Sequence, residues 1–248
     1  MNALLIMKYL VSIFLMALAA MPVYAETSST TDIINRARAT VGTESALEGL
    51  VTLQMLGRIE PSAAGLPDAA IMIVARKPTS QRLEVRMDDL VETTIVEGDH
   101  GCVVRTNLSQ EGSQMRTLTD EELKRVTLNT RQLFSFYRPD AVRGEQVEYA
   151  GIEQRRGVRS HKLIYTLPDG MATTRYFSVT EHSLVSSVSD KGIETVAVGE
   201  QVVGGIRFPE RVESYEGGTL LHTLVLTEVF ANKPLPAGIF SIPRGEQK

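Results

Sequence analysis

The feature that most constrains the fold is a long series of short segments in which apolar and polar residues alternate. This period of two is typical of half-buried β-strands. Strands are predicted near residues 50–59, 70–76, 81–87, 90–97, 101–106, 146–154, 158–167, 171–178, 184–189, 193–203, 206–215 and 220–230. Turn sequences such as Pro168-Asp-Gly170 and Gly217-Gly218 separate the segments, so strands that follow one another in the chain are expected to pair antiparallel.

A sheet of this size has to curl, because a twisted open sheet of roughly ten strands rarely stays flat. The predicted fold is mainly β, of the α+β type: an incomplete, strongly curved antiparallel β-barrel of roughly ten to eleven strands, with helices that plug or cover its concave face. No linker sequence divides the chain between Thr31 and Pro243. The sequence therefore predicts a single domain over residues 26–248.

One amphipathic helix interrupts the strand series. It begins at a capping box, Thr119-Asp-Glu-Glu122, and ends before Pro139. The apolar residues that recur at helical spacing, and that would face the sheet if this helix is a lid, are Leu123, Val126, Phe134 and Tyr137. A lid predicts that Phe134→Asp weakens ligand binding while the sheet stays folded, whereas a helix that completes the core predicts unfolding. A shorter amphipathic helix is predicted near residues 29–42.

The first 25 residues have the layout of a cleaved secretory signal. Lys8 precedes an apolar run over residues 9–20, and Val23-Tyr-Ala25 supplies a cleavage site before Glu26. The run is shorter than the ~20 residues of a membrane span, which disfavours the alternative of an uncleaved anchor. The residue after the cleavage site is Glu26 and not Cys. The mature protein is therefore expected in the periplasm, without a lipid anchor.

Composition and motifs disfavour several classes of function. The net charge is −4 and the basic residues are scattered, which disfavours nucleic acid as a partner. The four His residues lack metal-ligand spacing, and no Gly-x-Ser-x-Gly or phosphate-binding loop is present in the sequence. We therefore expect a monomeric protein that is not an enzyme and has no cofactor, metal or catalytic residues. Cys102 is the single Cys and is expected to be a buried thiol in a strand.

Three segments carry a resemblance to a known family. The first is Ala75-Arg-Lys-Pro78-Thr-Ser-Gln-Arg82-Leu-Glu-Val-Arg86, the second is Thr94-Ile-Val-Glu-Gly98-Asp-His-Gly101, and the third is Leu235-Pro-Ala-Gly-Ile-Phe240-Ser-Ile-Pro243-Arg-Gly245. Together with the order of the elements, they resemble the periplasmic carriers that sort outer-membrane lipoproteins, the LolA/LolB-like superfamily. The resemblance implies an incomplete antiparallel barrel whose concave apolar face, closed by helices, shelters acyl chains.

The resemblance also implies a latch for the lid. In the carriers, an Arg immediately before the Pro of the first segment helps to hold the lid shut. The matching position here is Lys77, with Arg76 one residue earlier. Lys lacks the forked hydrogen bonds of Arg, and an adjacent strand residue points to the other face of the sheet. The two candidates for the latch are therefore not equivalent to the residue of the family.

An acyl cavity needs apolar residues on one face of each strand. Burial of each methylene group of an acyl chain in such a cavity contributes about 0.8 kcal/mol of binding free energy. The candidates keep one parity within each strand, and they are Val51, Leu53, Met55, Leu83, Val85, Met87, Val91 and Ile95. Ordinary core packing is the alternative role for each of them.

Three functions follow from this reasoning. The first is a non-enzymatic periplasmic carrier or binder of lipids or lipoprotein acyl chains, which includes outer-membrane lipoprotein sorting. The second is an envelope protein-interaction or stress-sensing module on the same scaffold, with envelope membrane proteins as partners. An exported hydrolase with an unrecognised site ranks third.

Overall fold

The computed structural model describes residues 29–110 and 112–243. The predicted signal segment and its cleavage site lie outside the described residues. Within them, no helix combines the length and the apolar character that a membrane span requires. The helices are α1 (Thr30–Val41), α2 (Glu44–Gly49), α3 (Asp120–Ser135) and the 3-10 turn η1 (Ala141–Arg143).

Most of the strands form one antiparallel sheet of 13 strands. Its members are β1 (Thr52–Pro61), β2 (Ala69–Arg76), β3 (Ser80–Met87), β4 (Leu90–Glu97), β5 (His100–Asn107), β6 (Ser113–Thr117), β7 (Gln146–Arg155), β8 (Val158–Thr166), β9 (Ala172–Ser178), β10 (Leu184–Ser189), β11 (Ile193–Val198), β14 (Arg211–Glu216) and β15 (Thr219–Ala231). A separate hairpin is formed by β12 (Gln201–Val203) and β13 (Ile206–Phe208).

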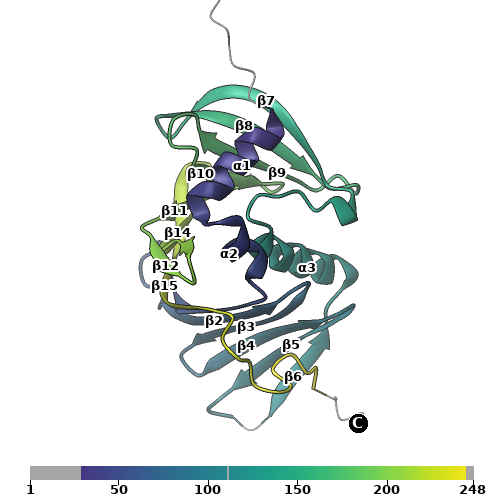
Figure 1. The fold of residues 1–248 in the computed structure, drawn as a ribbon. Coiled ribbons are helices and arrows are strands. Elements are labelled where there is room, and N and C mark those ends of the chain that lie inside the picture. The colour runs from purple at the N-terminus through teal and green to yellow at the C-terminus, as the bar shows by residue number, and fades with distance from the viewer. Residues whose placement is uncertain (1–28, 111, 244–248) are drawn as a thin grey trace, which may run out of the picture.

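The strand order is β6-β5-β4-β3-β2-β1-β15-β14-β11-β10-β9-β8-β7. Two meanders, β1 to β6 and β7 to β15, are therefore joined where β1 pairs with β15, with Leu53 opposite Ala231. The sheet is open, with β6 and β7 as its edges, and it bends around the helices (Figure 1). The prediction of a mainly antiparallel β fold is confirmed, and the sheet has more strands than the ten to eleven expected.

Helix α3 connects the two edges of the sheet. The chain leaves β6, passes through α3 and enters β7, and α3 lies on the side toward which the sheet curves (Figure 1). We call the face of the sheet that contacts the helices the inner face, and the opposite one the outer face. The capping box predicted from the sequence is present, because Thr119 accepts a hydrogen bond from the Glu122 backbone and the Glu122 carboxylate accepts one from Thr119 N.

Apolar packing on the inner face forms three clusters of described residues. The cluster at the centre of the sheet joins Leu47 of α2 and Phe134 of α3 to β1, β2 and β15. The cluster under α1 joins Ile33, Ile34 and Ala37 to β8 and β9. A third, smaller cluster packs the first half of α3 against β4 and β5. The core is therefore distributed along the sheet, with a helix covering each part.

Cys102 lies in β5 and is buried. Burial raises the pKa of its thiol, which confirms the expectation of a buried strand thiol.

Candidate ligand-binding site

Helix α3 contacts β3 and β4 of the first meander. Leu123 and Val126 pack against Val96, Val103 and Leu118. One turn further on, Thr130 is fully buried and its hydroxyl donates to Gln81 Oε1 of β3. The first meander therefore holds this side of α3 through apolar packing and a buried hydrogen bond.

The last turn of α3 enters a different cluster. Phe134 is buried with Leu53, Met55 and Ala75 in the central cluster. Tyr137, just beyond the helix, packs at the cluster under α1, where its ring lies edge-on to Phe177 with 5.1 Å between ring centres. Desolvation raises the pKa of Tyr137 to about 12. The four predicted lid residues therefore divide among three clusters, and whether the helix opens as a lid stays a prediction.

Arg38 of α1 closes the C-terminal end of α3. Its side chain is almost fully buried, and Nη1 donates to the carbonyl oxygens of Ser135 at 2.7 Å and Phe136 at 2.9 Å. The Ser135 carbonyl also accepts a hydrogen bond from Arg138 N at 3.0 Å, just beyond the helix. A cation is favoured at this end of the helix dipole. The same guanidinium forms a forked ion pair with Glu44 of α2, with distances of 2.8 and 2.7 Å. Arg38 thus ties three helices together.

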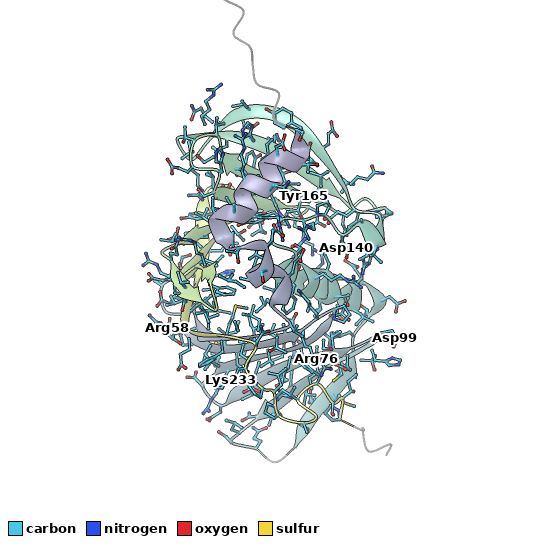
Figure 2. All side chains as sticks on the ribbon, viewed as in Figure 1. Arg58, Arg76, Asp99, Asp140, Tyr165 and Lys233 are labelled. Atoms are coloured by element: carbon cyan, nitrogen blue, oxygen red, sulfur yellow. The ribbon has the colours of Figure 1, made fainter. Side chains whose placement is uncertain are left out.

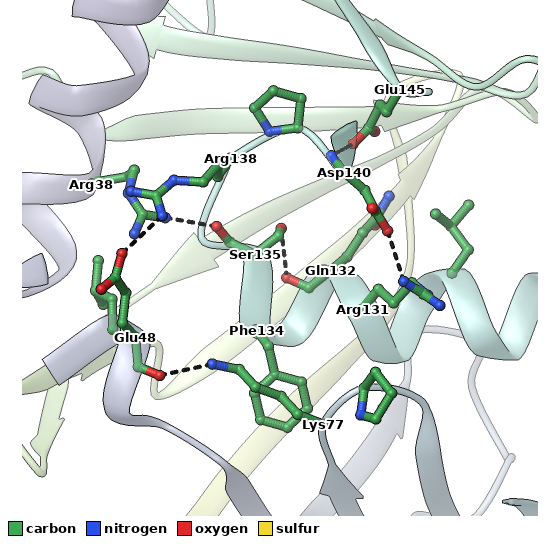
Figure 3. A pocket seen from close by; sticks show the side chains of 14 residues that line it. Arg38, Glu48, Lys77, Arg131, Gln132, Phe134, Ser135, Arg138, Asp140 and Glu145 are labelled. Carbon is green, nitrogen blue, oxygen red and sulfur yellow. Dashed lines mark hydrogen bonds and ion pairs between the residues drawn. The ribbon is translucent and has the colours of Figure 1, made fainter. Parts of the chain in front are cut away.

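Lys77 and Arg138 extend this network. The Lys77 ammonium donates to the Glu48 carbonyl at 3.0 Å and lies 5.7 Å from the centre of the Phe134 ring (Figure 3). Desolvation lowers the pKa of Lys77. Arg138 pairs with Glu44 at 2.8 Å and Glu48 at 3.0 Å, and the hydrogen bond from Arg38 is the main cause that lowers the pKa of Glu44.

Arg76, the other latch candidate, lies on the outer face. It pairs with Glu97 at 2.8 Å, and its guanidinium lies 4.9 Å from the centre of the Phe240 ring. The two candidates therefore point to opposite faces, and of the two it is Lys77 that contacts the helices. The latch role itself stays a prediction.

Two cavities flank the C-terminal half of α3. One, of about 260 Å³, lies between α3, α2 and the β2–β3 turn, and Figure 3 shows the side chains that line it. The other, of about 400 Å³, lies between α3 and the strands β8 to β11. Leu128, Gln132 and Glu145 line both cavities. Helix α3 therefore has a cavity toward α2 and the β2–β3 turn and a larger one toward the second meander.

The larger cavity has a mixed lining. Its apolar side chains include Leu128, Leu167, Met171 and Ile193, and its hydroxyl groups come from Thr173, Ser187, Ser189, Thr195 and Tyr165. Its charged side chains are Arg125, Glu145, Asp190 and Lys191, and Arg125 pairs with Asp190 at 3.5 Å. A cavity of this size lies within the range of small-molecule sites, and its lining suits a molecule with an apolar part and a polar part.

The eight residues predicted to contact acyl chains are not among those that line these two cavities. Leu53 and Met55 are buried in the central cluster, and Leu83 and Val85 lie half-buried on the inner face. Val51 precedes β1 and is 50% exposed, and Met87 is exposed at the end of β3.

Val91 and Ile95 lie on the outer face, because they pair with Arg86 and Arg82 rather than with Val85 or Leu83. Residues directly opposite each other share a face. Val91 and Ile95 therefore could not line a cavity on the inner face of the sheet.

Catalytic or metal chemistry was not expected from the sequence. Over residues 29–110 and 112–243, no three His, Cys, Asp or Glu side chains gather in a way that could hold a metal ion. His161 is buried and lies 3.4 Å from the Tyr149 hydroxyl, and burial is the main cause that lowers its pKa. This histidine is therefore favoured in its neutral form.

The fold has counterparts among solved structures. A DUF1329 family protein from Desulfovibrio piger superposes with a TM-score of 0.55 at 9% identity, over 85% of this chain and 96% of the other. A LolA superfamily protein from Nitrosomonas europaea superposes with a TM-score of 0.55 at 10% identity, over 86% and 97%. No protein-family model matches the sequence, and no curated protein matches it. The chain therefore has a LolA/LolB-like fold, as the three sequence segments predicted.

Proposed function

We propose that this protein is a periplasmic, non-enzymatic carrier or binder of lipids or lipoprotein acyl chains. The observation that carries the proposal is the larger cavity between α3 and β8 to β11, which has both apolar and hydroxyl-bearing walls. The LolA/LolB-like fold supports a role in lipid or lipoprotein binding at the level of the superfamily. In this proposal, residues 1–25 are removed on export, and residues 26–248 act as one monomeric domain.

The sheet supplies a matched pair of positions for a test. Thr173 lies on the inner face opposite Tyr165 and lines the larger cavity, whereas the next residue, Thr174, pairs with Ile164 on the outer face. Thr173→Phe should place an aromatic ring in the cavity and narrow it, and Thr174→Phe adds the same ring outside it. Binding of an apolar fluorescent probe, and its displacement by a fatty acid, should be lost in Thr173→Phe alone.

Lipids extracted from protein purified out of a native envelope should also be identified by mass spectrometry. Stoichiometric lipid in the wild type and in Thr174→Phe, with its loss in Thr173→Phe, supports the proposal. Equal probe binding by both variants would show that the larger cavity is not the lipid site.

A second candidate function is an envelope protein-interaction module. The observation that favours it is the open edge at β7, a strand of ten residues that pairs with β8 alone among the described residues. An unpaired edge can accept an extended segment of another protein. A Pro at an outward-facing amide of β7 that abolishes capture of an envelope protein, while lipid binding is retained, would favour this function.

A further inference from the structure

Arg175 is a buried positive charge on the inner face of the sheet. It lies in β9 between Leu163 of β8 and Ser187 of β10, and only 7% of the residue is exposed. A guanidinium stays protonated in proteins. Its charge is therefore held in the interior.

No carboxylate offsets this charge among the described residues. Arg38, the other arginine buried to this extent, has Glu44 at 2.7 Å, whereas Arg175 has no ion pair within 4.0 Å in residues 29–110 and 112–243. Its guanidinium instead lies over the Tyr165 ring, 4.1 Å from the ring centre, and 5.8 Å from that of Tyr137. Contacts with aromatic rings offset only part of the cost of burying a charge.

The neighbours of Arg175 line the larger cavity. Ser187 is its direct partner across the strands, Thr195 follows Ser187 in the same row of the sheet, and both line the cavity. Tyr165, whose ring the Arg175 guanidinium stacks over, also lines the cavity. It is labelled in Figure 2. Within the described part of the chain, the sealed side-chain atoms without a partner do not include a nitrogen of Arg175. Arg175 is not itself among the residues that line the cavity, and its guanidinium lies over the ring of one of them, Tyr165.

The acidic side chains of the cavity are already engaged. Asp190 pairs with Arg125 at 3.5 Å, and the Glu145 carboxylate accepts a hydrogen bond from Asp140 N at 2.7 Å. Among the described residues, Arg175 is left without a carboxylate partner beside a cavity wall that bears hydroxyl groups. Two of these hydroxyls already donate within the protein, Tyr165 to the Tyr137 carbonyl at 2.8 Å and Thr195 to the Ser187 carbonyl at 3.4 Å. Hydroxyl groups and a forked guanidinium are the donors that bind carboxylate and phosphate oxygens.

We propose that Arg175 is the counter-ion for the anionic head group, a carboxylate or a phosphate, of an amphiphile held in the larger cavity. The hydroxyls of Ser187 and Thr195 complete the head-group site, and Leu128, Leu167 and Ile193 contact the apolar part. This inference rests on the proposed function and deepens it, because it assigns the chemical class of the ligand. It also accounts for the burial of a charge that this chain leaves unpaired.

The test uses three probes with the same chain and different head groups: oleate, oleyl phosphate and oleyl alcohol, each below its micelle concentration. Wild-type protein should bind at least one of the anions about 10-fold or more tightly than the alcohol, since hydrogen bonds to charged groups are stronger than neutral ones. The anion with the larger advantage identifies the head group. Arg175→Met should bind all three probes equally, with the alcohol affinity unchanged.

Lys162→Met is the matched control, because it removes a positive charge near the Tyr176 ring on the outer face. This variant should keep the preference of the wild type for the anion. Arg175→Lys should keep part of it, because Lys preserves the charge and loses the fork. Without ligand, Arg175→Met should melt no lower than the wild type, since it removes an unpaired charge and fills similar space.

The outcomes separate the two proposals. Equal binding of the three probes by the wild type would overturn the head-group site and leave the proposed function standing. Binding of none of them would overturn both. A melting temperature of Arg175→Met well below that of the wild type would assign Arg175 a structural role and overturn the inference.

Discussion

The two sides of α3 differ in how they meet the sheet. Toward the first meander, Thr130 and Phe134 are buried against β1 to β3. Toward the second meander, Leu128 and Gln132 face the larger cavity, and the wall across from them bears hydroxyl groups. The comparison shows that one helix serves both as a core element and as a cavity wall, because residues two positions apart lie on different sides of it.

The largest effect is expected from Phe134. Phe134→Ala should lower the free energy of unfolding by about 3–5 kcal/mol, because it empties space in the central cluster. Leu128→Ala, on the cavity side of the same helix, should cost clearly less and should change probe binding instead. Urea denaturation and probe titration of both variants measure this. Equal losses of stability in the two variants would show that the two sides of α3 do not differ in how they contribute to the core.

Arg38 is expected to have the next largest effect. Arg38→Met should lower the free energy of unfolding by about 2–3 kcal/mol, because the carbonyls at the end of α3 lose a charged donor. Arg36→Met, on the exposed face of α1, is the control and should stay within about 0.5 kcal/mol of the wild type. Similar losses for both arginines would show that Arg38 does not hold α3 in place.

The buried hydrogen bond of α3 should contribute less. Thr130→Val keeps the shape and removes the donor to Gln81, so it should cost about 1–2 kcal/mol by leaving the amide unpaired. Combining it with Gln81→Leu should restore part of the loss, and a double-mutant cycle measures the coupling. Strictly additive losses would argue against this hydrogen bond as an anchor of α3.

The smallest effect is expected on the stability of the protein at low pH. The hydrogen bond from Arg116 is the main cause that lowers the pKa of Glu122 from 4.5 to about 2. A carboxyl group with a lowered pKa stabilises the folded state above its unfolded pKa and loses this contribution as the pH falls. Stability should therefore decrease between pH 4.5 and about 2. Glu122→Gln should flatten this decrease and Glu121→Gln, one residue earlier, should not, which acid titration of the melting temperature measures.

The strands were predictable because residues with strong turn preferences, such as Pro, Asp and Gly, separate them in the sequence. Segments such as Pro168-Asp-Gly170 separate alternating runs, and the strands found there match the prediction closely. β6 was missed because all five of its residues are exposed, so it shows no apolar alternation. The predicted strand over 193–203 is divided by a turn at Gly199, which separates β11 from the β12–β13 hairpin.

The site was less predictable because it depends on register and on distant contacts. Leu83 pairs with Thr94 and Val85 with Glu92, so odd residues of β3 share a face with even residues of β4. Parity within each strand could not reveal this offset. Arg38 and Arg175 looked like scattered charges, because burial and the absence of a carboxylate partner are properties of the folded chain.

The order of the strands has a consequence for the folding of the chain. Within each meander, pairing joins strands that are close in sequence, so little loop-closure entropy opposes it. The β1–β15 seam is different, because it brings together Leu56 and Thr227, which are 171 positions apart. Each meander is therefore expected to form early, and the sheet becomes one body only when its last strand docks onto its first.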